Sequence, residues 1–278
     1  FGSRSSFCLF WIKSAMALPG SYAERLLAAP DLCRQQLQYA QSAYRGEVRS
    51  DQSFPDWEYV VPVSALSSIL SDFLHQDGTT AVEALRVIGR VRVPRGSDES
   101  RYAGVAELAF RGTANTSNWS TNLTADLERS EVGNCKGCLH RGFQHAYMAI
   151  RDGMYRKLDD GLSALSIEDP ADAEPQVLVF LTGHSLGGAL ATLAAYDLGC
   201  SARYSVCCVT WGCPRVGDAE FVADCTKVAP QMARFLNKFD PVPRLLSNPN
   251  DLNSDTPFLN DTWSVRVNHA LQVPQKML

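Results

Sequence analysis

The sequence predicts an α/β fold: a mostly parallel central sheet flanked by helices, in a single domain. The first observation is the continuous apolar run of residues 176–181, which is typical of a strand covered on both faces. The second is that strand and helix patterns alternate from residue 176 onward, as they do around a parallel sheet. The third is that no stretch of the 278 residues resembles an interdomain linker.

Hydrophobic spacing predicts the elements of the first half. Apolar residues at helical spacing predict three helices, over residues 32–44, 64–74 and 143–165. Alternating apolar and polar residues over 85–93 predict a half-exposed strand, and a second strand is predicted over 102–110.

In the second half, strands and short helices follow one another closely. After the strand at 176–181, we expect helices over 186–198 and 218–228. Further strands are predicted over 204–211, 232–239 and 262–267. The Asn-, Asp-, Ser- and Pro-rich stretch 247–257 is predicted to be a surface loop.

Composition excludes several function classes. The 26 Lys and Arg against 30 Asp and Glu give a formal net charge of -4, which provides no electrostatic footprint for nucleic acid. Because the chain contains no run of 18 apolar residues, no transmembrane helix is expected.

The first thirty residues are predicted to be an N-terminal extension of a domain spanning 31–278. The apolar stretch 7–12, preceded by Arg4 and followed by Ala15-Met16-Ala17, partly matches a signal peptide. Alternatively, Met16 is the true start and the preceding residues are upstream translation. The first interpretation favours secretion, which we prefer, and the second implies a cytoplasmic protein.

A Cys-x-x-Cys pair raises the question of a metal site. Cys135 and Cys138 lie near His140 and His145, but no second Cys pair follows at zinc-finger or ribbon spacing. A turn, or a disulfide in a secreted chain, is therefore the preferred interpretation. We predict no metal and no cofactor.

The chemistry is carried by Gly183-His184-Ser185-Leu186-Gly187, which matches G-x-S-x-G. The bare pattern is weak, but here it follows the most apolar strand and opens a small-residue helix. That context predicts a nucleophile elbow, with Ser185 on a sharp turn at the sheet edge. We expect the two glycines to let the strand and the helix approach closely.

A serine nucleophile needs a histidine base oriented by a carboxylate. In this fold the order is Ser, Asp or Glu, then His, and His269 is the one histidine after Ser185. Asp240 directly follows the strand predicted at 232–239, and catalytic groups gather at the carboxyl ends of such strands. We therefore predict the triad Ser185, Asp240 and His269.

The tetrahedral intermediate requires two backbone N–H donors. Leu186, the residue after the nucleophile, is predicted to supply one. The second is expected after an earlier strand, where Phe110-Arg111-Gly112-Thr113 ends the strand from Tyr102. Thr113 is the candidate donor.

Together these motifs resemble the class 3 lipases, the fungal-type triacylglycerol lipase family of α/β-hydrolases. The matching strings occur in family order over roughly residues 85–270; they are Phe110–Thr113, Asn118-Trp119, Asp126-Leu127, His140–Phe143, Gly183–Gly188, Trp211–Gly217 and Asp240–Pro243.

The resemblance implies an esterase or lipase with the triad and oxyanion hole given above. It also implies a lid, at about residues 114–134, with Trp119 on its apolar side. Most of the side chains between 115 and 124 are polar, which argues against strong interfacial activation. We expect a lipid ester substrate and transient, reversible contact with a lipid–water interface.

Three functions remain open at this stage. The preferred one is a carboxylic-ester hydrolase acting on acylglycerols or related lipid esters through an acyl-enzyme. The same triad could instead serve a phospholipase A1, a galactolipase or a feruloyl esterase. A non-catalytic, lipase-like interaction module is disfavoured because all three triad candidates are present.

Overall fold

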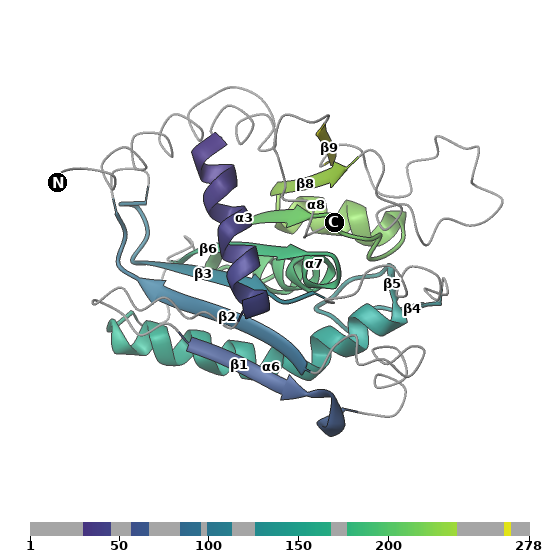
Figure 1. Cartoon of the computed structure of the whole chain (residues 1–278), viewed down its shortest axis with the longest axis horizontal. Helices are drawn as coiled ribbons and strands as arrows, with labels where there is room; N and C mark the ends of the chain where they lie inside the picture. The colour runs from purple at the N-terminus through teal and green to yellow at the C-terminus, as the bar shows by residue number, and fades with distance from the viewer. Residues whose placement is uncertain are drawn as a thin grey trace.

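In the computed structural model, a seven-stranded sheet runs through the described part of the chain, with helices on both faces (Figure 1). The residues that the structure describes are 30–45, 57–66, 84–95, 99–112, 126–167, 177–237 and 264–267. The strands, in spatial order, are β1 (Trp57–Pro62), β2 (Ala84–Arg92), β3 (Gly104–Phe110), β6 (Val177–His184), β7 (Tyr204–Trp211), β8 (Gln231–Asn237) and β9 (Ser264–Val267).

The sheet is antiparallel at one end and parallel over the rest. β1 pairs with β2 and β2 with β3 in antiparallel register. From β3 onward each neighbouring pair is parallel. Helices lie in the described connections from β3 to β6, from β6 to β7 and from β7 to β8, as parallel crossovers require. The predicted α/β fold with a mostly parallel sheet is confirmed. The carboxyl ends of β3, β6, β7, β8 and β9 therefore lie along one edge, and the carboxyl end of β1 lies at the same edge.

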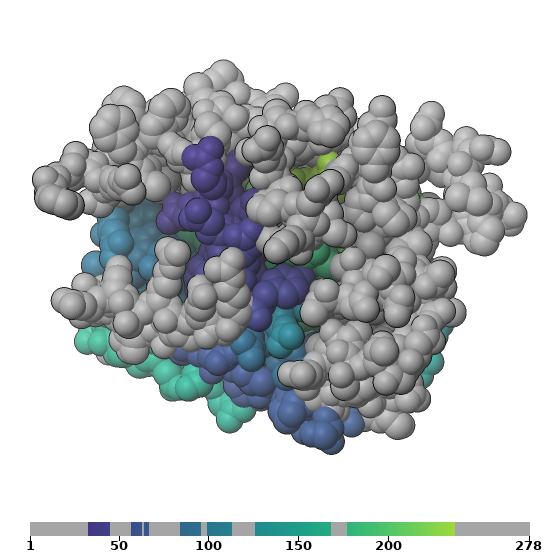
Figure 2. Space-filling model, in the orientation of Figure 1, coloured from purple at the N-terminus to yellow at the C-terminus, as the bar shows by residue number. Residues whose placement is uncertain are grey.

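Among the described residues, three helices cover one face of the sheet and one helix covers the other. α6 (Arg141–Ala164), α7 (Leu186–Gly199) and α8 (Ala219–Val228) share a core with the inward side chains of the strands. α3 (Pro30–Arg45) crosses the opposite face, in front of the sheet in Figure 1 and at the surface in Figure 2. The sheet is thus sandwiched where α3 and α7 overlap.

The burial of β6 on both faces explains the continuous apolar run in its sequence. Val177, Val179 and Leu181 face the α6–α7 core, whereas Leu178 and Phe180 face the side covered by α3. Every residue of β6 is buried. Successive strand residues point to opposite faces, so a strand covered twice has no place for an exposed polar residue.

Most predicted elements are confirmed within one to three residues of their bounds. The prediction that 85–93 is half-exposed was wrong: β2 is buried along most of its length, because α6 packs on one face and α3 on the other. The edge strand β1 was not predicted, and most of the helix expected over 64–74 falls outside the described residues, after the short 3-10 turn Val63–Ala65.

A two-stranded hairpin, also not predicted, precedes α6. It pairs β4 (Leu127–Arg129) with β5 (Cys138–His140). Between them Cys135 closes a turn, its sulfur accepting a hydrogen bond from the N–H of Gly137 at 3.3 Å. Cys135 and Cys138 form no disulfide.

The N-terminal extension predicted for residues 1–30 lies almost wholly outside the described residues, so the alternatives for its origin stay predictions. Within the described ranges, no helix combines the length and apolar character needed to cross a bilayer.

Candidate active site

Ser185 forms the whole turn between β6 and α7. β6 ends at His184 and α7 begins at Leu186. A reversal within one residue demands an unusual backbone, and Ser185 has φ 55° and ψ -127°. Such a conformation costs about 1–3 kcal/mol and persists only where its surroundings enforce it. Here the N–H of Ser185 donates to the carbonyl of Trp211 at 2.9 Å, and its own carbonyl accepts from Gly188 at 2.9 Å.

The glycines on either side of Ser185 let three backbone segments touch. A Cβ on Gly183 would collide with the backbone of Gly187 and Gly188. A Cβ on Gly187 would collide with the carbonyl oxygen of Phe110, at the end of β3. The close approach expected from the motif is therefore confirmed, and it extends to the loop after β3.

The side chain of Ser185 is buried but unsatisfied. The residue is 1% exposed, and no described residue hydrogen-bonds to its Oγ. A buried hydroxyl without a partner costs free energy, so such a group in a native fold calls for an explanation. A nucleophile held ready for a base and a substrate provides one.

The N-terminus of α7 supplies backbone donors beside this hydroxyl. Leu186 is the first residue of the helix, and the first N–H groups of a helix have no intrahelical acceptor. They also carry the partial positive charge of the helix dipole, which stabilises developing negative charge. The Leu186 N–H is therefore suited to the oxyanion role predicted for it.

Four further candidate residues, Thr113, Trp119, Asp240 and His269, lie outside the described residues. The strands that precede Thr113, Asp240 and His269 along the chain, β3, β8 and β9, are described. Across the sheet, His184 pairs with Trp211, Trp211 with Phe235 and Phe235 with Val265, while Phe110 pairs with Gly183.

These pairs form one row near the carboxyl edge of the sheet. Along the chain, Thr113 follows Phe110 by three residues, Asp240 follows Phe235 by five and His269 follows Val265 by four. The candidates thus belong to segments that leave the sheet at the edge where Ser185 turns.

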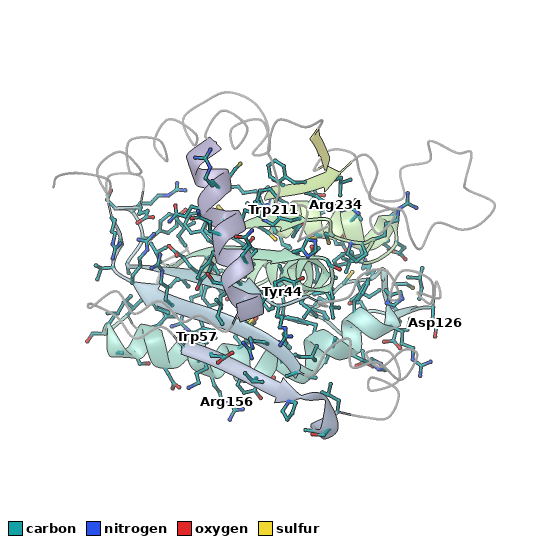
Figure 3. All side chains as sticks on the ribbon, in the orientation of Figure 1. Tyr44, Trp57, Asp126, Arg156, Trp211 and Arg234 are labelled. Atoms are coloured by element: carbon teal, nitrogen blue, oxygen red, sulfur yellow. The ribbon has the colours of Figure 1, made fainter. Side chains whose placement is uncertain are left out.

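Tyr44, which sequence reasoning missed, reaches this site from α3. Its hydroxyl lies 2.8 Å from Nδ1 of His184, the residue before Ser185. Figure 3 shows Tyr44 near the end of α3 that overlies the sheet. No motif could have revealed it, because 140 residues separate it from His184.

Burial keeps both rings of this pair neutral. Desolvation lowers the pKa of His184 to about 4, since a buried imidazole is costly to protonate. Desolvation likewise raises the pKa of Tyr44, opposed by the nearby charge of Arg111. His184 is therefore a neutral, buried partner of Tyr44 beside Ser185.

Two other histidines have structural partners. His140 caps α6, its Nδ1 accepting from the N–H of Phe143 at 3.4 Å. Nε2 of His145 lies 3.1 Å from a carboxylate oxygen of Glu128. Among the described residues no cluster of His, Cys, Asp or Glu is arranged to hold a metal ion.

Comparison with known proteins adds sequence relatives. Residues 107–249, more than half of the chain, match the family described as Lipase (class 3). A phospholipase A1 of Oryza sativa subsp. indica is 32% identical over 182 residues, which cover 58% of this chain and 40% of that protein. A secreted mono- and diacylglycerol lipase A of Penicillium cyclopium is 33% identical over 139 residues, covering 50% and 42%. The chain thus spans less than half the length of these relatives.

Solved structures share the fold. A triacylglycerol lipase from Penicillium expansum superposes with a TM-score of 0.55 at 17% identity, covering 81% of this chain and 75% of that one. The Rhizomucor miehei lipase propeptide complex gives 0.53 at 22% identity, covering 78% and 62%. At this identity the likeness concerns the fold, and it confirms the predicted α/β-hydrolase architecture.

Proposed function

The chain belongs to the class 3 lipase family, as its motifs predicted, and from this premise we propose that it is a serine carboxylic-ester hydrolase acting on acylglycerols or related lipid esters. One observation carries the proposal most directly. Ser185 is held in a strained one-residue turn with a buried Oγ that no described residue binds, beside the N-terminus of α7. The unsatisfied hydroxyl and the strain together are features of an activated nucleophile.

In the proposed reaction, Oγ of Ser185 attacks the ester carbonyl carbon while His269 takes the hydroxyl proton. Asp240 holds the imidazole in the required tautomer and stabilises its charged form. The tetrahedral intermediate then collapses: the carbon–oxygen bond to the alcohol breaks, and His269 returns the proton to the leaving alkoxide. Water, deprotonated by His269, releases the acid from the acyl-enzyme.

The negative oxygen of the intermediate would be held by the N–H groups of Leu186 and Thr113. Each such donor accounts for about 10²–10³ in rate in a water-excluded site. The contact between the loop after β3 and Gly187 supports this assignment, because it brings the residue before Thr113 against the first turn of α7. No step requires a metal or a cofactor.

The lid was predicted over about residues 114–134, but 126–134 belong to the β4–β5 hairpin, where Val132 is buried in the core shared with α6. We further propose that the remaining part of this range, with Trp119 on its apolar side, is a lid that makes transient contact with a lipid–water interface. The polar composition of residues 115–124 favours weak interfacial activation. A net charge of -4 gives no additional attraction to anionic lipid.

A second candidate is a phospholipase A1. It is favoured by the names of two relatives, from Oryza sativa subsp. indica and from Arabidopsis thaliana, the latter 30% identical over 171 residues. The same triad would cleave the sn-1 ester of a phospholipid, so the two candidates differ in the head group that the site accepts.

The test is hydrolysis of p-nitrophenyl esters from acetyl to palmitoyl, below and above their solubility limits, by the wild type and Ser185→Ala. Ser205→Ala is the matched control, because Ser205 lies at the other end of β7 from Trp211. We expect Ser185→Ala to lose at least 10³-fold in kcat, as expected for a catalytic nucleophile, and Ser205→Ala to stay within twofold.

Diacylglycerol and phosphatidylcholine, each labelled at the sn-1 ester, then separate the lipase from the phospholipase. Full activity of Ser185→Ala would disprove the triad. Wild type that neither hydrolyses any ester nor reacts with a fluorophosphonate would instead support a non-catalytic module.

A further inference from the structure

We propose that Tyr44 is a positioning residue: its hydroxyl holds Gly112, in the loop after β3, against the nucleophile turn and so orders the backbone beside Ser185 for catalysis. This rests on the proposed ester-hydrolase function. It assigns a catalytic consequence to α3, a helix that lies on the opposite face of the sheet from α7.

A single phenol oxygen contacts both segments that must be aligned. The hydroxyl of Tyr44 lies 2.8 Å from Nδ1 of His184 and 3.4 Å from the carbonyl oxygen of His184. The same hydroxyl lies against Gly112, where an added Cβ would collide with it. His184 immediately precedes Ser185, and Gly112 immediately precedes Thr113.

The loop after β3 and the nucleophile turn lie too close together for a side chain at position 112. A Cβ on Gly112 would collide with both the Tyr44 hydroxyl and the His184 carbonyl oxygen, and it would lie 3.3 Å from the N–H nitrogen of Gly187. The backbone atoms of the loop and the turn are therefore already in contact. The phenol oxygen contacts both of them.

Two polar atoms of His184 face the phenol. Nδ1 lies at 2.8 Å and the carbonyl oxygen at 3.4 Å, so the hydroxyl of Tyr44 is tied to the ring and to the backbone of the residue before Ser185. Removing the hydroxyl takes this partner from Nδ1 and opens space beside Gly112, so the loop after β3 loses its contact with the turn.

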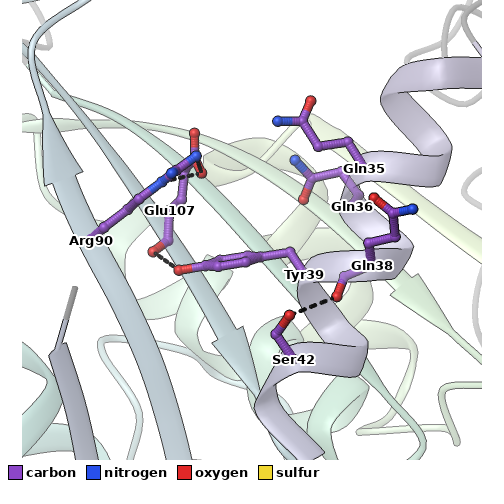
Figure 4. A pocket seen from close by; sticks show the side chains of 7 residues that line it. All are labelled: Gln35, Gln36, Gln38, Tyr39, Ser42, Arg90 and Glu107. Carbon is purple, nitrogen blue, oxygen red and sulfur yellow. Dashed lines mark hydrogen bonds and ion pairs between the residues drawn. The ribbon is translucent and has the colours of Figure 1, made fainter. Parts of the chain in front are cut away.

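The test compares Tyr44→Phe with Tyr39→Phe on the same helix. The Tyr39 hydroxyl also bonds a backbone atom of the sheet, donating to the carbonyl oxygen of Glu107 at 3.0 Å, but at a polar pocket away from the nucleophile (Figure 4). The two variants lose the same atom and a comparable hydrogen bond. Kinetics on soluble p-nitrophenyl butyrate are normalised to the fraction that a fluorophosphonate can titrate.

We expect Tyr44→Phe to lower kcat about 10-fold, less than the 10²–10³ lost when an oxyanion donor is deleted, because the donors remain but are poorly held. KM should stay within twofold. A trifluoromethyl ketone, which forms an anionic adduct with the nucleophile, should show a Ki raised about 10-fold, in step with kcat/KM. Tyr39→Phe should change none of these by more than twofold.

The outcomes separate the two proposals. An active wild type in which Tyr44→Phe matches Tyr39→Phe in kcat and Ki overturns the role of Tyr44 alone. A fall in kcat without a matching rise in the Ki of the trifluoromethyl ketone also overturns it. Tyr44→Phe would then slow the reaction without weakening the binding of the anionic adduct. A wild type with no hydrolysis and no titratable serine overturns the proposed function, and the role of Tyr44 with it.

Discussion

The two ends of α7 are stabilised in opposite ways. At the N-terminal end, backbone packs on backbone, Ser185 is strained, and its buried hydroxyl has no partner in the described part of the chain. At the C-terminal end, the buried carboxylate of Asp197 accepts hydrogen bonds from the Tyr147 hydroxyl at 2.7 Å and from Nε of Arg151 at 2.7 Å. The N-terminal end of α7 therefore carries unfavourable free energy, whereas the buried carboxylate at the C-terminal end has its hydrogen-bond partners.

The difference distinguishes the end of α7 that stabilises the fold from the end that is proposed to take part in the chemistry. The satisfied end ties α7 to α6 by a charged network between side chains. The strained end depends on the absence of side chains, because a single Cβ would block the contact with the loop after β3. Changes at the two ends should therefore have different signatures in stability and in activity.

The largest effect is expected from Gly187→Ala. The new methyl would collide with the carbonyl of Phe110, a backbone atom that cannot rotate away. We expect a loss of about 4 kcal/mol or more in the free energy of unfolding, as for severe overpacking, together with loss of ester hydrolysis. Urea titration and kinetics measure both.

Gly188→Ala is the matched control for Gly187→Ala. Its Cβ would lie 2.9 Å from the Cβ of Cys213 and 3.3 Å from the backbone carbonyl oxygen of Gly183, a milder overlap than at Gly187, and alanine favours the helix. We expect a cost of about 2 kcal/mol. Equal losses in the two variants would contradict the view that the backbone contact at Gly187 is special.

The next effect tests the satisfied end. Asp197→Ala leaves Arg151 and Tyr147 without their shared acceptor, and we expect it to cost about 3 kcal/mol, because Arg151 is partly exposed and can recover some hydration. kcat per folded molecule should not change. Asp159→Asn, which removes an exposed partner of Arg203, should cost under about 0.5 kcal/mol. A fall in kcat of Asp197→Ala would show that the two ends are coupled.

Sequence alone predicted the parts of the site that depend on chain order. The elbow followed from a buried strand, a G-x-S-x-G motif and a small-residue helix, all within 25 residues. Asp240 was chosen from the strand predicted before it and His269 as the one histidine after Ser185, and both remain predictions. β2 was misjudged because its polar residues Arg86 and Arg90 alternate with apolar ones, yet both pair with carboxylates of neighbouring strands.

The features that the sequence could not predict depend on contacts between residues far apart in the chain. Tyr44 lies in an amphipathic helix and has no local feature that distinguishes it from Tyr39. Its role arises only when α3 packs across the sheet and brings its hydroxyl to His184. The network around Asp197 was missed for the same reason, since it joins two helices 46 to 50 residues apart in the chain.

A pH-dependent effect is expected at the strained end. Burial lowers the pKa of His184 from 6.5 to about 4, so between these values the unfolded chain binds a proton that the folded protein does not. Stability should therefore fall as pH decreases through this window, by up to about 1.4 kcal/mol per pH unit from this group. His184→Asn removes the titration and keeps a polar atom near the position of Nδ1. Urea titrations at pH 7, 6 and 5 should show a shallower decline for His184→Asn, and parallel declines would contradict the assignment.

The smallest expected effect is a change in the free energy of unfolding, and its sign tells whether Ser185 is kept for function or for structure. Ser185→Ala removes a buried hydroxyl that no described residue binds, so we expect it to raise the free energy of unfolding by about 1 kcal/mol while abolishing hydrolysis. Ser205→Ala removes a hydroxyl that accepts from the Tyr102 hydroxyl at 3.1 Å, and should lower it by about 1 kcal/mol with hydrolysis intact. If both substitutions destabilise the protein, the Ser185 hydroxyl has a structural partner and the strained end of α7 is less costly than its geometry indicates. Opposite signs would mean that the protein keeps a destabilising serine at this turn, which stability cannot explain and catalysis can.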